Sequence, residues 1–118
     1  LGYCAADDPL YLSTRRTLLS AENPFYYEGA YAKGIGSPHT PPRYVWPIGL
    51  SIQGLTSPDK AEKAAILDNL VAIDAGTHLM HEGVCVDDPT QYTREWFSWS
   101  NMMFCELVMD YFGIRVKR

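Results

Sequence analysis

The residues from Arg94 to Phe112 place the strongest constraint on the fold, because large apolar side chains recur on nearly every side of the helix that they predict. A helix that is apolar nearly all round has to be buried by its neighbours on most sides. One partner helix could not cover such a surface. The sequence therefore predicts a buried last helix, beginning at Thr93 and continuing to Gly113, within a fold of several helices.

Capping patterns indicate the other helices. Asp8 followed by Pro9 is typical of an N-cap and a first helical position, and this helix runs to about Ser20. Two later helices start around prolines in a similar way, one from Pro47 to about Leu55 and one from Ser57-Pro58-Asp59 to Ala75-Gly76. Asp88 before Pro89 repeats the capping pattern.

The second of these helices carries Gly49, Ser51 and Gly54, which are small enough to allow close helix packing. No stretch of the chain shows the apolar–polar alternation of a convincing strand. The predicted fold class is therefore all-α.

Residues 24–44 have neither a helical nor a strand period, and glycines, prolines and tyrosines dominate them. Long loops without their own secondary structure are usually functional or disordered in compact domains. The aromatic content argues against disorder. We therefore expect an ordered functional loop.

Composition excludes several classes of function. A formal net charge of −4 and an isoelectric point near 5.2 leave no basic footprint for nucleic acid. No run of about 18 apolar residues could span a membrane, so we expect neither nucleic acid nor a membrane as a partner. The chain starts at Leu1 and runs straight into a helical pattern, which indicates a piece of a longer protein.

The three cysteines, Cys4, Cys85 and Cys105, are odd in number and widely spaced. This spacing argues against a disulfide framework and against a CxxC-type zinc site. We expect three small buried side chains. Free cysteines favour a reducing, cytoplasmic compartment, but the compartment itself stays open.

The connection from His78 to Pro89 places two histidines and three carboxylates between apolar segments. Loops carry chemistry more often than cores do, and Glu82 stands after both histidines and before Gly83. A zinc protease motif would read H-E-x-x-H on a helix. Here the order is H-x-x-H-E, so we expect capping or packing histidines, with no metal and no cofactor.

A second reading makes Glu82 the general base of a glycosidase, which needs two carboxyl groups. Asp87 and Asp88 are candidates for the second group, although Asp88 before Pro89 is more simply an N-cap. Sugar rings also pack on flat aromatic faces. These could come from Tyr44, Trp46, Trp96 and Trp99.

Several ordered motifs between about residues 24 and 105 resemble glycoside hydrolase family 125. They are Glu28-Gly29, Tyr31, Lys33 through Pro41, Trp46-Pro47-Ile48, Gln53 through Ser57, Gly76-Thr77, Met80-His81-Glu82, Asp87-Asp88-Pro89, Tyr92-Thr93-Arg94, Trp96-Phe97 and Trp99. The resemblance covers most of the chain.

The resemblance implies an exo-acting α-1,6-mannosidase that inverts configuration, needs no metal and folds as an (α/α)6 barrel. It makes Glu82 the general base and places the general acid, an aspartate, upstream of this sequence. Residues 1–118 would then be a C-terminal fragment of one catalytic domain, with about the last four barrel helices. The rest of that domain would be a required partner, and the fragment alone would be inactive.

The resemblance also implies which residues bind mannose-containing oligosaccharide. Ser37, His39, Tyr44, Trp46 and His81 would hold the sugar, and Asp87 or Arg94 would orient the base. The sequence departs from the family at Gly83, Val84, Cys85 and Glu95, which bears on substrate detail and leaves the base in place. Two alternatives remain open, a non-catalytic carbohydrate-binding module and a purely structural helical fragment.

Overall fold

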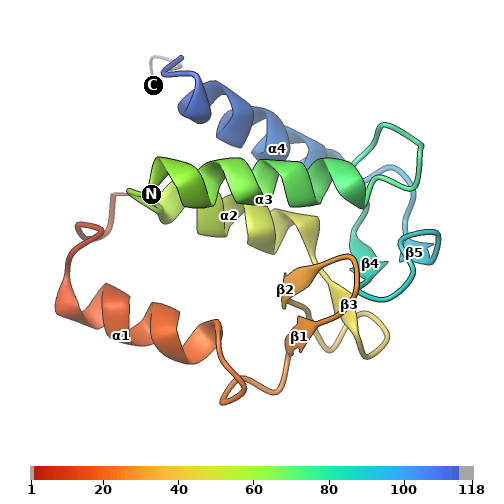
Figure 1. The fold of residues 1–118 in the computed structure, drawn as a ribbon, viewed down its shortest axis with the longest axis horizontal. Helices are drawn as coiled ribbons and strands as arrows, with labels where there is room; N and C mark the ends of the chain where they lie inside the picture. Colours follow the sequence, from red (N-terminus) through yellow and green to blue (C-terminus); the bar gives the residue numbers. More distant parts are fainter. Residues whose placement is uncertain (1, 115–118) are drawn as a thin grey trace.

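The computed structural model describes residues 2–114. Four helices and five short strands follow one another along the chain (Figure 1). They are α1 (Pro9–Leu18), β1 (Tyr26–Glu28), β2 (Lys33–Ile35), β3 (Tyr44–Val45), α2 (Pro47–Thr56), α3 (Lys60–Ala72), β4 (Gly83–Cys85), β5 (Tyr92–Thr93) and α4 (Ser98–Tyr111).

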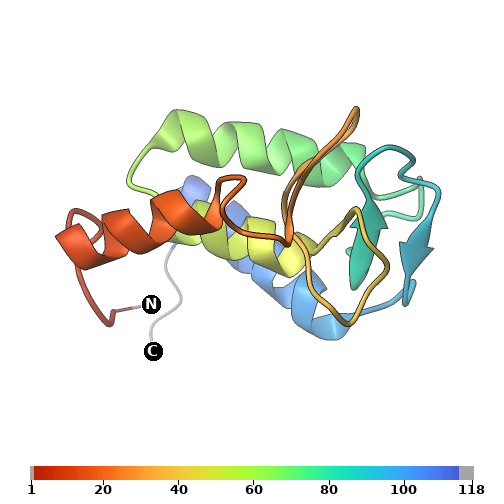
Figure 2. The same cartoon turned by 90° about the horizontal axis from the view of Figure 1, so that it is seen from below.

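Helices α2, α3 and α4 pack on one another, and both sheets lie together at one end of this bundle (Figures 1 and 2). The approach of α2 to α4 depends on Gly54. A Cβ atom at this position would lie 2.8 Å from Cδ1 of Leu107, whose side chain is fully buried. The small residues of this helix therefore do allow close packing, as expected at Gly54.

The strands form two antiparallel sheets. β1 pairs with β2, while β4 is the central strand of the order β3–β4–β5, with Val84 opposite both Val45 and Tyr92. A bridge between Gly36 and Val45 links the two sheets. Val45, Val84 and Val86 have no exposed surface and continue the helical core into the sheet end.

The all-α prediction is wrong, because the chain is a small α+β structure rather than an all-helical section of an (α/α)6 barrel. Its strands are only two or three residues long, too short to show alternation in the sequence. Of the strand pairs, β3–β4 joins segments far apart in the chain, whereas β1–β2 and β4–β5 join neighbouring segments. Residues 24–44 are thus ordered, but they contain strands rather than a structureless loop.

Helix boundaries were predicted with mixed success. Asp8 and Asp59 each accept a hydrogen bond from the backbone N–H two residues ahead, and α2 begins at Pro47. The last helix starts at Ser98 rather than Thr93, because Tyr92 and Thr93 pair with β4 and Arg94 has a φ of 48°.

No helix starts at Pro89 either. Asp88 instead caps a turn. Its Oδ1 accepts two hydrogen bonds from Thr90, one from the backbone N–H at 3.0 Å and one from the Thr90 hydroxyl at 2.6 Å. The expectation of three buried cysteine side chains is wrong as well. Cys4 and Cys105 are exposed, and Cys85 is half-buried.

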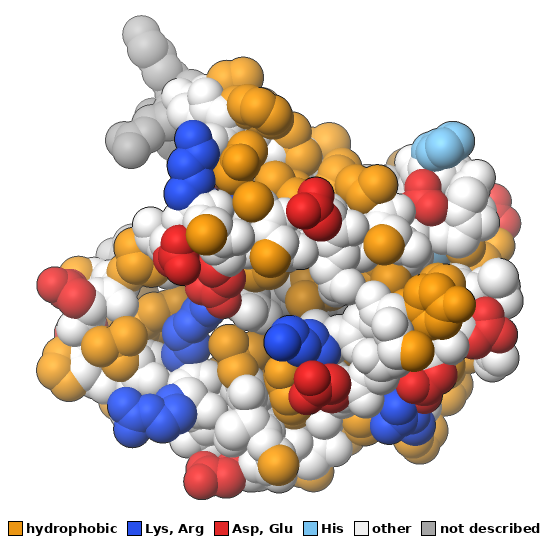
Figure 3. Space-filling view, in the orientation of Figure 1, with side chains coloured by type: hydrophobic (Ala, Val, Ile, Leu, Met, Phe, Trp, Pro, Cys, Tyr) orange, Lys and Arg blue, Asp and Glu red, His pale blue; other side chains and the backbone are white. Residues whose placement is uncertain are grey.

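Helix α4 has open apolar surface on two sides. Along the seam with α3, Val71 and Phe112 are 58% and 70% exposed, and hydrophobic side chains line this edge in the upper part of Figure 3. A second groove of 620 Å³ is lined by Trp96, Met102, Met109 and neighbouring residues. Across residues 2–114, no helix combines the length and apolar character needed to cross a membrane.

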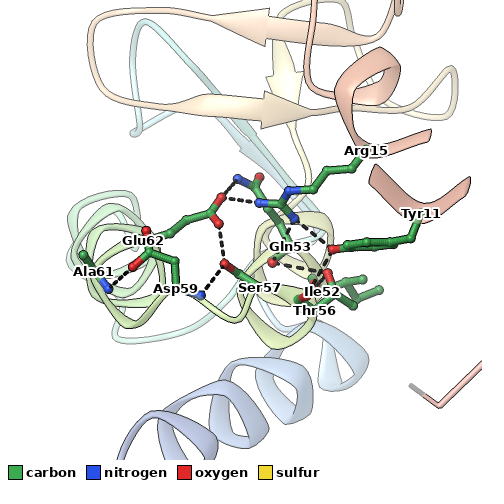
Figure 4. Close-up of polar contacts among 9 residues, drawn as sticks. All are labelled: Tyr11, Arg15, Ile52, Gln53, Thr56, Ser57, Asp59, Ala61 and Glu62. Atoms are coloured by element: carbon green, nitrogen blue, oxygen red, sulfur yellow. Dashed lines mark hydrogen bonds and ion pairs between the residues drawn. The ribbon is translucent and has the colours of Figure 1, made fainter. Parts of the chain in front are cut away.

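Helix α1 lies beside the bundle and is joined to it by a polar cluster around Glu62 (Figure 4). The Glu62 carboxylate pairs with Arg15 and accepts hydrogen bonds from Gln53 Nε2 at 2.9 Å and from the Ser57 hydroxyl. Tyr11 adds a hydrogen bond from its hydroxyl to the Thr56 carbonyl at 3.1 Å. One carboxylate on α3 thus holds α1 and the end of α2.

We predict that Glu62→Ala lowers the free energy of unfolding by about 1–3 kcal/mol, because it leaves Arg15, Gln53 and Ser57 without their shared acceptor. Urea unfolding of the full-length protein measures this change. Glu22→Ala is the matched control, since Glu22 is exposed and its carboxylate forms no hydrogen bond or ion pair among the described residues; its effect should stay within about 0.5 kcal/mol. Equal effects of the two variants would contradict the role given to Glu62.

Candidate active site

Glu82 directly precedes the central strand β4, and its backbone N–H donates to the Thr93 carbonyl at 3.1 Å. The β4–β5 register, with Gly83 opposite Thr93, places Glu82 and Arg94 at the next position across the pair. The Arg94 Nε lies 3.7 Å from Glu82 Oε2, and the two side chains are 61% and 19% exposed. A largely covered carboxylate thus faces an open guanidinium.

Arg94 is held in position from two directions. Its backbone is in the left-handed region, which turns the chain out of β5, and its guanidinium lies over the Phe97 ring at 5.5 Å from the centroid. Stacking of arginine on an aromatic face restricts where the guanidinium points. The structure therefore brings together the predicted base and one of its two predicted orienting residues.

His81 is fully buried, so its side chain has no surface for a sugar in this structure. Its Nδ1 donates to the Glu95 carbonyl at 2.6 Å, its Nε2 lies 3.2 Å from the Asp74 carbonyl, and its ring stacks on Tyr92 at 3.9 Å between centroids. These contacts come from two segments, one at Asp74 and one at residues 92–95. His81 therefore anchors the backbone that carries Glu82.

The remaining predicted sugar-binding residues gather around the turn of residues 37–40. The Ser37 hydroxyl accepts from the His39 backbone N–H at 3.2 Å, and the Ser37 carbonyl accepts from the Thr40 hydroxyl at 3.3 Å. Trp46 Nε1 donates to Thr40 Oγ1 at 3.1 Å, and the His39 and Trp46 rings lie 6.5 Å apart. Residues 37–40 with Trp46 are called the Trp46 turn below.

Tyr44 lies at the edge of this group, on β3 opposite Cys85. Burial raises the pKa of its phenol above the usual value, and the nearby Cys85 and Asp88 add to the increase. The phenol O–H can both donate and accept a hydrogen bond.

Asp87 is placed differently from Arg94. Both of its carboxylate oxygens are held by Arg43, with Nε to Oδ2 at 2.6 Å and Nη2 to Oδ1 at 2.8 Å. Arg43 also donates to the Glu28 carbonyl at 3.2 Å. This pair fastens the β1–β2 hairpin to the end of β4, and neither oxygen is directed to Glu82.

Trp96 and Trp99 are 63% and 62% exposed and belong to the region of α4 rather than to the Trp46 turn. His78 projects from the surface and lies 3.4 Å from Asp74. Within residues 2–114, no group of three or more His, Cys, Asp or Glu side chains is arranged to hold a metal ion.

Sequence reasoning gave no role in the site to Thr40, Arg43, Tyr92 or Thr93, and it placed Thr93 only at the start of the last helix. Thr40 is buried and joins Ser37 to Trp46, whereas the Thr93 hydroxyl is buried without a partner among the described residues. Nothing in the spacing of Arg43 and Asp87 signals their pairing. Tyr92-Thr93-Arg94 is one of the motifs that resemble glycoside hydrolase family 125. Its presence among them was the sequence signal that this segment could lie near Glu82.

The pairing with Arg43 predicts a pH dependence. The Arg43 hydrogen bond holds the pKa of Asp87 below its usual value, so the folded state binds fewer protons than the unfolded state. The ion pair therefore contributes to the free energy of unfolding above the unfolded-state pKa of Asp87, about 3.9. This contribution is lost as pH falls through the lower folded-state pKa.

We therefore expect Asp87→Asn to flatten the loss of stability of the full-length protein below about pH 4. Urea midpoints measured from neutral to acidic pH follow the change. Asp68→Asn is the control, because Asp68 is exposed on α3 and forms no ion pair within the described residues. If both substitutions change the loss of stability at acidic pH equally, the Arg43–Asp87 pair is not the cause of that loss.

Comparison with known proteins identifies the family of this chain. A family model described as metal-independent alpha-mannosidase, GH125, matches residues 1–109. The meiotically up-regulated gene 157 protein of Schizosaccharomyces pombe is 48% identical over 111 residues, which cover 93% of this chain and 22% of that protein.

A solved structure from Streptococcus pneumoniae is also similar. It is a metal-independent alpha mannosidase in a non-productive substrate complex with α-1,6-mannobiose, 67% identical to this chain with a TM-score of 0.95. The match covers 97% of this chain and 27% of that one, so the chain spans about a quarter of these relatives. With residues 1–109 matched by the family model, the chain belongs to the GH125 family of metal-independent α-mannosidases.

Proposed function

We propose that this chain is the C-terminal segment of an exo-acting catalytic domain that releases terminal α-1,6-linked mannose from oligosaccharides or N-glycans, with Glu82 as the general base. The observation that carries this proposal is the Glu82–Arg94 pair. The similarity to the Streptococcus pneumoniae structure, which was solved with α-1,6-mannobiose, supports the choice of substrate.

In the proposed inverting reaction, the Glu82 carboxylate takes a proton from water as the water oxygen attacks the anomeric carbon. Arg94 orients the carboxylate. The glycosidic C–O bond breaks, and its oxygen receives a proton from a general acid outside these 118 residues. Mannose is released with inverted configuration.

The Trp46 turn is the proposed site of sugar contact. Ser37 and His39 present polar groups, Trp46 presents an aromatic face, and the neutral Tyr44 hydroxyl can donate to a sugar oxygen. His81 acts from the interior by holding the backbone of Glu82, and Asp87 acts by holding the hairpin. These two residues are thus positioning residues in the proposal.

The rest of the catalytic domain is the proposed partner of the open face of α4. Contiguous exposed apolar surface promotes association, and Trp99, Met102 and Phe112 are 62%, 70% and 70% exposed. About three-quarters of the length of the Streptococcus pneumoniae chain lies outside the match. That missing part can cover the helix.

Glu82→Gln in the full-length protein tests the base. We expect turnover of α-1,6-mannobiose to fall by about 10²–10⁴-fold, because the amide cannot accept the proton, while mannose still binds. Glu22→Gln, which removes an exposed carboxylate in the turn after α1, should turn over like the wild type. A protein that binds mannobiose and never cleaves it would instead be a carbohydrate-binding module.

A glutamine variant as active as the wild type would contradict the assignment of Glu82 as the general base. It would favour the alternative in which the chain is a purely structural helical fragment.

The isolated 118-residue chain should release no mannose, because the general acid and the covering part of the domain are absent from it. Mannose release is measured beside the full-length protein at equal molar concentration. Release by the isolated chain at a comparable rate would contradict both the placement of the acid and the need for a partner.

A further inference from the structure

Gly83 stands in the middle of the site, next to Glu82 and opposite Thr93 in the β4–β5 pair. Glycine is unfavourable within a strand, where it weakens packing and costs backbone entropy. Its backbone here belongs to an ordinary extended strand, so no left-handed conformation requires it. Some other feature of the structure must explain glycine at this position.

The feature is the close approach of the Trp46 turn. A Cβ atom at Gly83 would lie 3.0 Å from Cγ2 of Thr40 and 3.2 Å from Oγ1 of Thr93. Optimal carbon–carbon separations are about 3.5–4.0 Å. A methyl group at position 83 therefore requires Thr40 or Thr93 to move by a few tenths of an ångström.

The turn cannot absorb such a push at Thr40 alone. Thr40 is buried, and its Oγ1 both donates to the Ser37 carbonyl and accepts from Trp46 Nε1. A displaced Thr40 therefore carries Ser37 and Trp46 with it or breaks these bonds. On the other side, Glu82 is held through its backbone hydrogen bond to Thr93.

We propose that Gly83 is a positioning residue, which sets the distance between the Trp46 turn and the backbone that carries Glu82. This inference rests on the proposed function, since it takes the turn to hold the sugar and Glu82 to be the base. Gly83 touches no substrate in the proposal. It acts through Thr40.

The test is a double-mutant cycle in the full-length protein with Gly83→Ala and Thr40→Ser. Serine removes the Cγ2 atom that the added methyl would meet, and keeps the hydroxyl that bonds Trp46 and Ser37. We expect Gly83→Ala to lower kcat/KM for α-1,6-mannobiose by about tenfold, since a 1 Å misplacement can cost about 10²-fold. The kcat/KM of Thr40→Ser alone is the reference of the cycle, and against that reference the added alanine should cost much less than it does in the wild type.

A second readout is independent of turnover. The indole N–H resonance of Trp46, assigned by its loss in Trp46→Phe, reports the hydrogen bond to Thr40. We expect Gly83→Ala to shift this resonance and the double variant to return it toward the wild-type position. General destabilisation by the alanine would not be reversed by a smaller residue at position 40.

The outcomes separate the two proposals. Tenfold loss with recovery in the double variant, and a matching indole shift, supports the role of Gly83. An alanine variant with wild-type kcat/KM and an unshifted resonance overturns it, as does a double variant no better than the single one.

If the wild type binds mannobiose without cleaving it, the proposed catalysis fails. The role of Gly83 is then decided by the indole shift and the affinity for mannobiose. It is upheld if both change in Gly83→Ala and recover in the double variant, and overturned if either does not.

Discussion

The central position of β4 is the constraint on which the rest of the site depends. This three-residue strand pairs on one side with β3 and on the other with β5, and Val84 in its middle has no exposed surface. The three segments come from residues 44–45, 83–85 and 92–93, so the β3–β4 pairing closes a long loop and the β4–β5 pairing closes a short one.

The position of each candidate site residue is set by where it lies on or beside these three strands. Glu82 and Arg94 lie just outside the β4–β5 pair, and Tyr44 lies on β3. The backbone N–H groups of Tyr31 and Ala32 both donate to the Val86 carbonyl, so the β1–β2 hairpin is tied to the end of the same strand. Loss of β4 pairing would therefore disperse the whole site.

The helices provide the rigid base for this sheet, but their core is open on α4. Leu107 is fully buried against Gly54, whereas other apolar residues of α4 remain in contact with solvent. The hydrophobic core of the described chain is thus covered on one side and open to solvent along α4. A ring of polar contacts around Glu62 joins α1 to it through charge and hydrogen bonds rather than apolar burial, since α1 has no buried residue.

The sequence by itself determined the helix starts at Pro9 and Pro47, the cap at Asp59 and the motifs around Glu82, because these depend on neighbouring residues in the chain. The strands, the late start of α4, the burial of His81 and the Arg43–Asp87 pair were decided by tertiary structure. The physical reason is the same for all of them. Their hydrogen bonds and ring contacts join residues in different segments of the chain, from neighbouring strands in β1–β2 and β4–β5 to the distant residues of β3–β4 and Arg43–Asp87, and no local pattern records which segment will supply the partner.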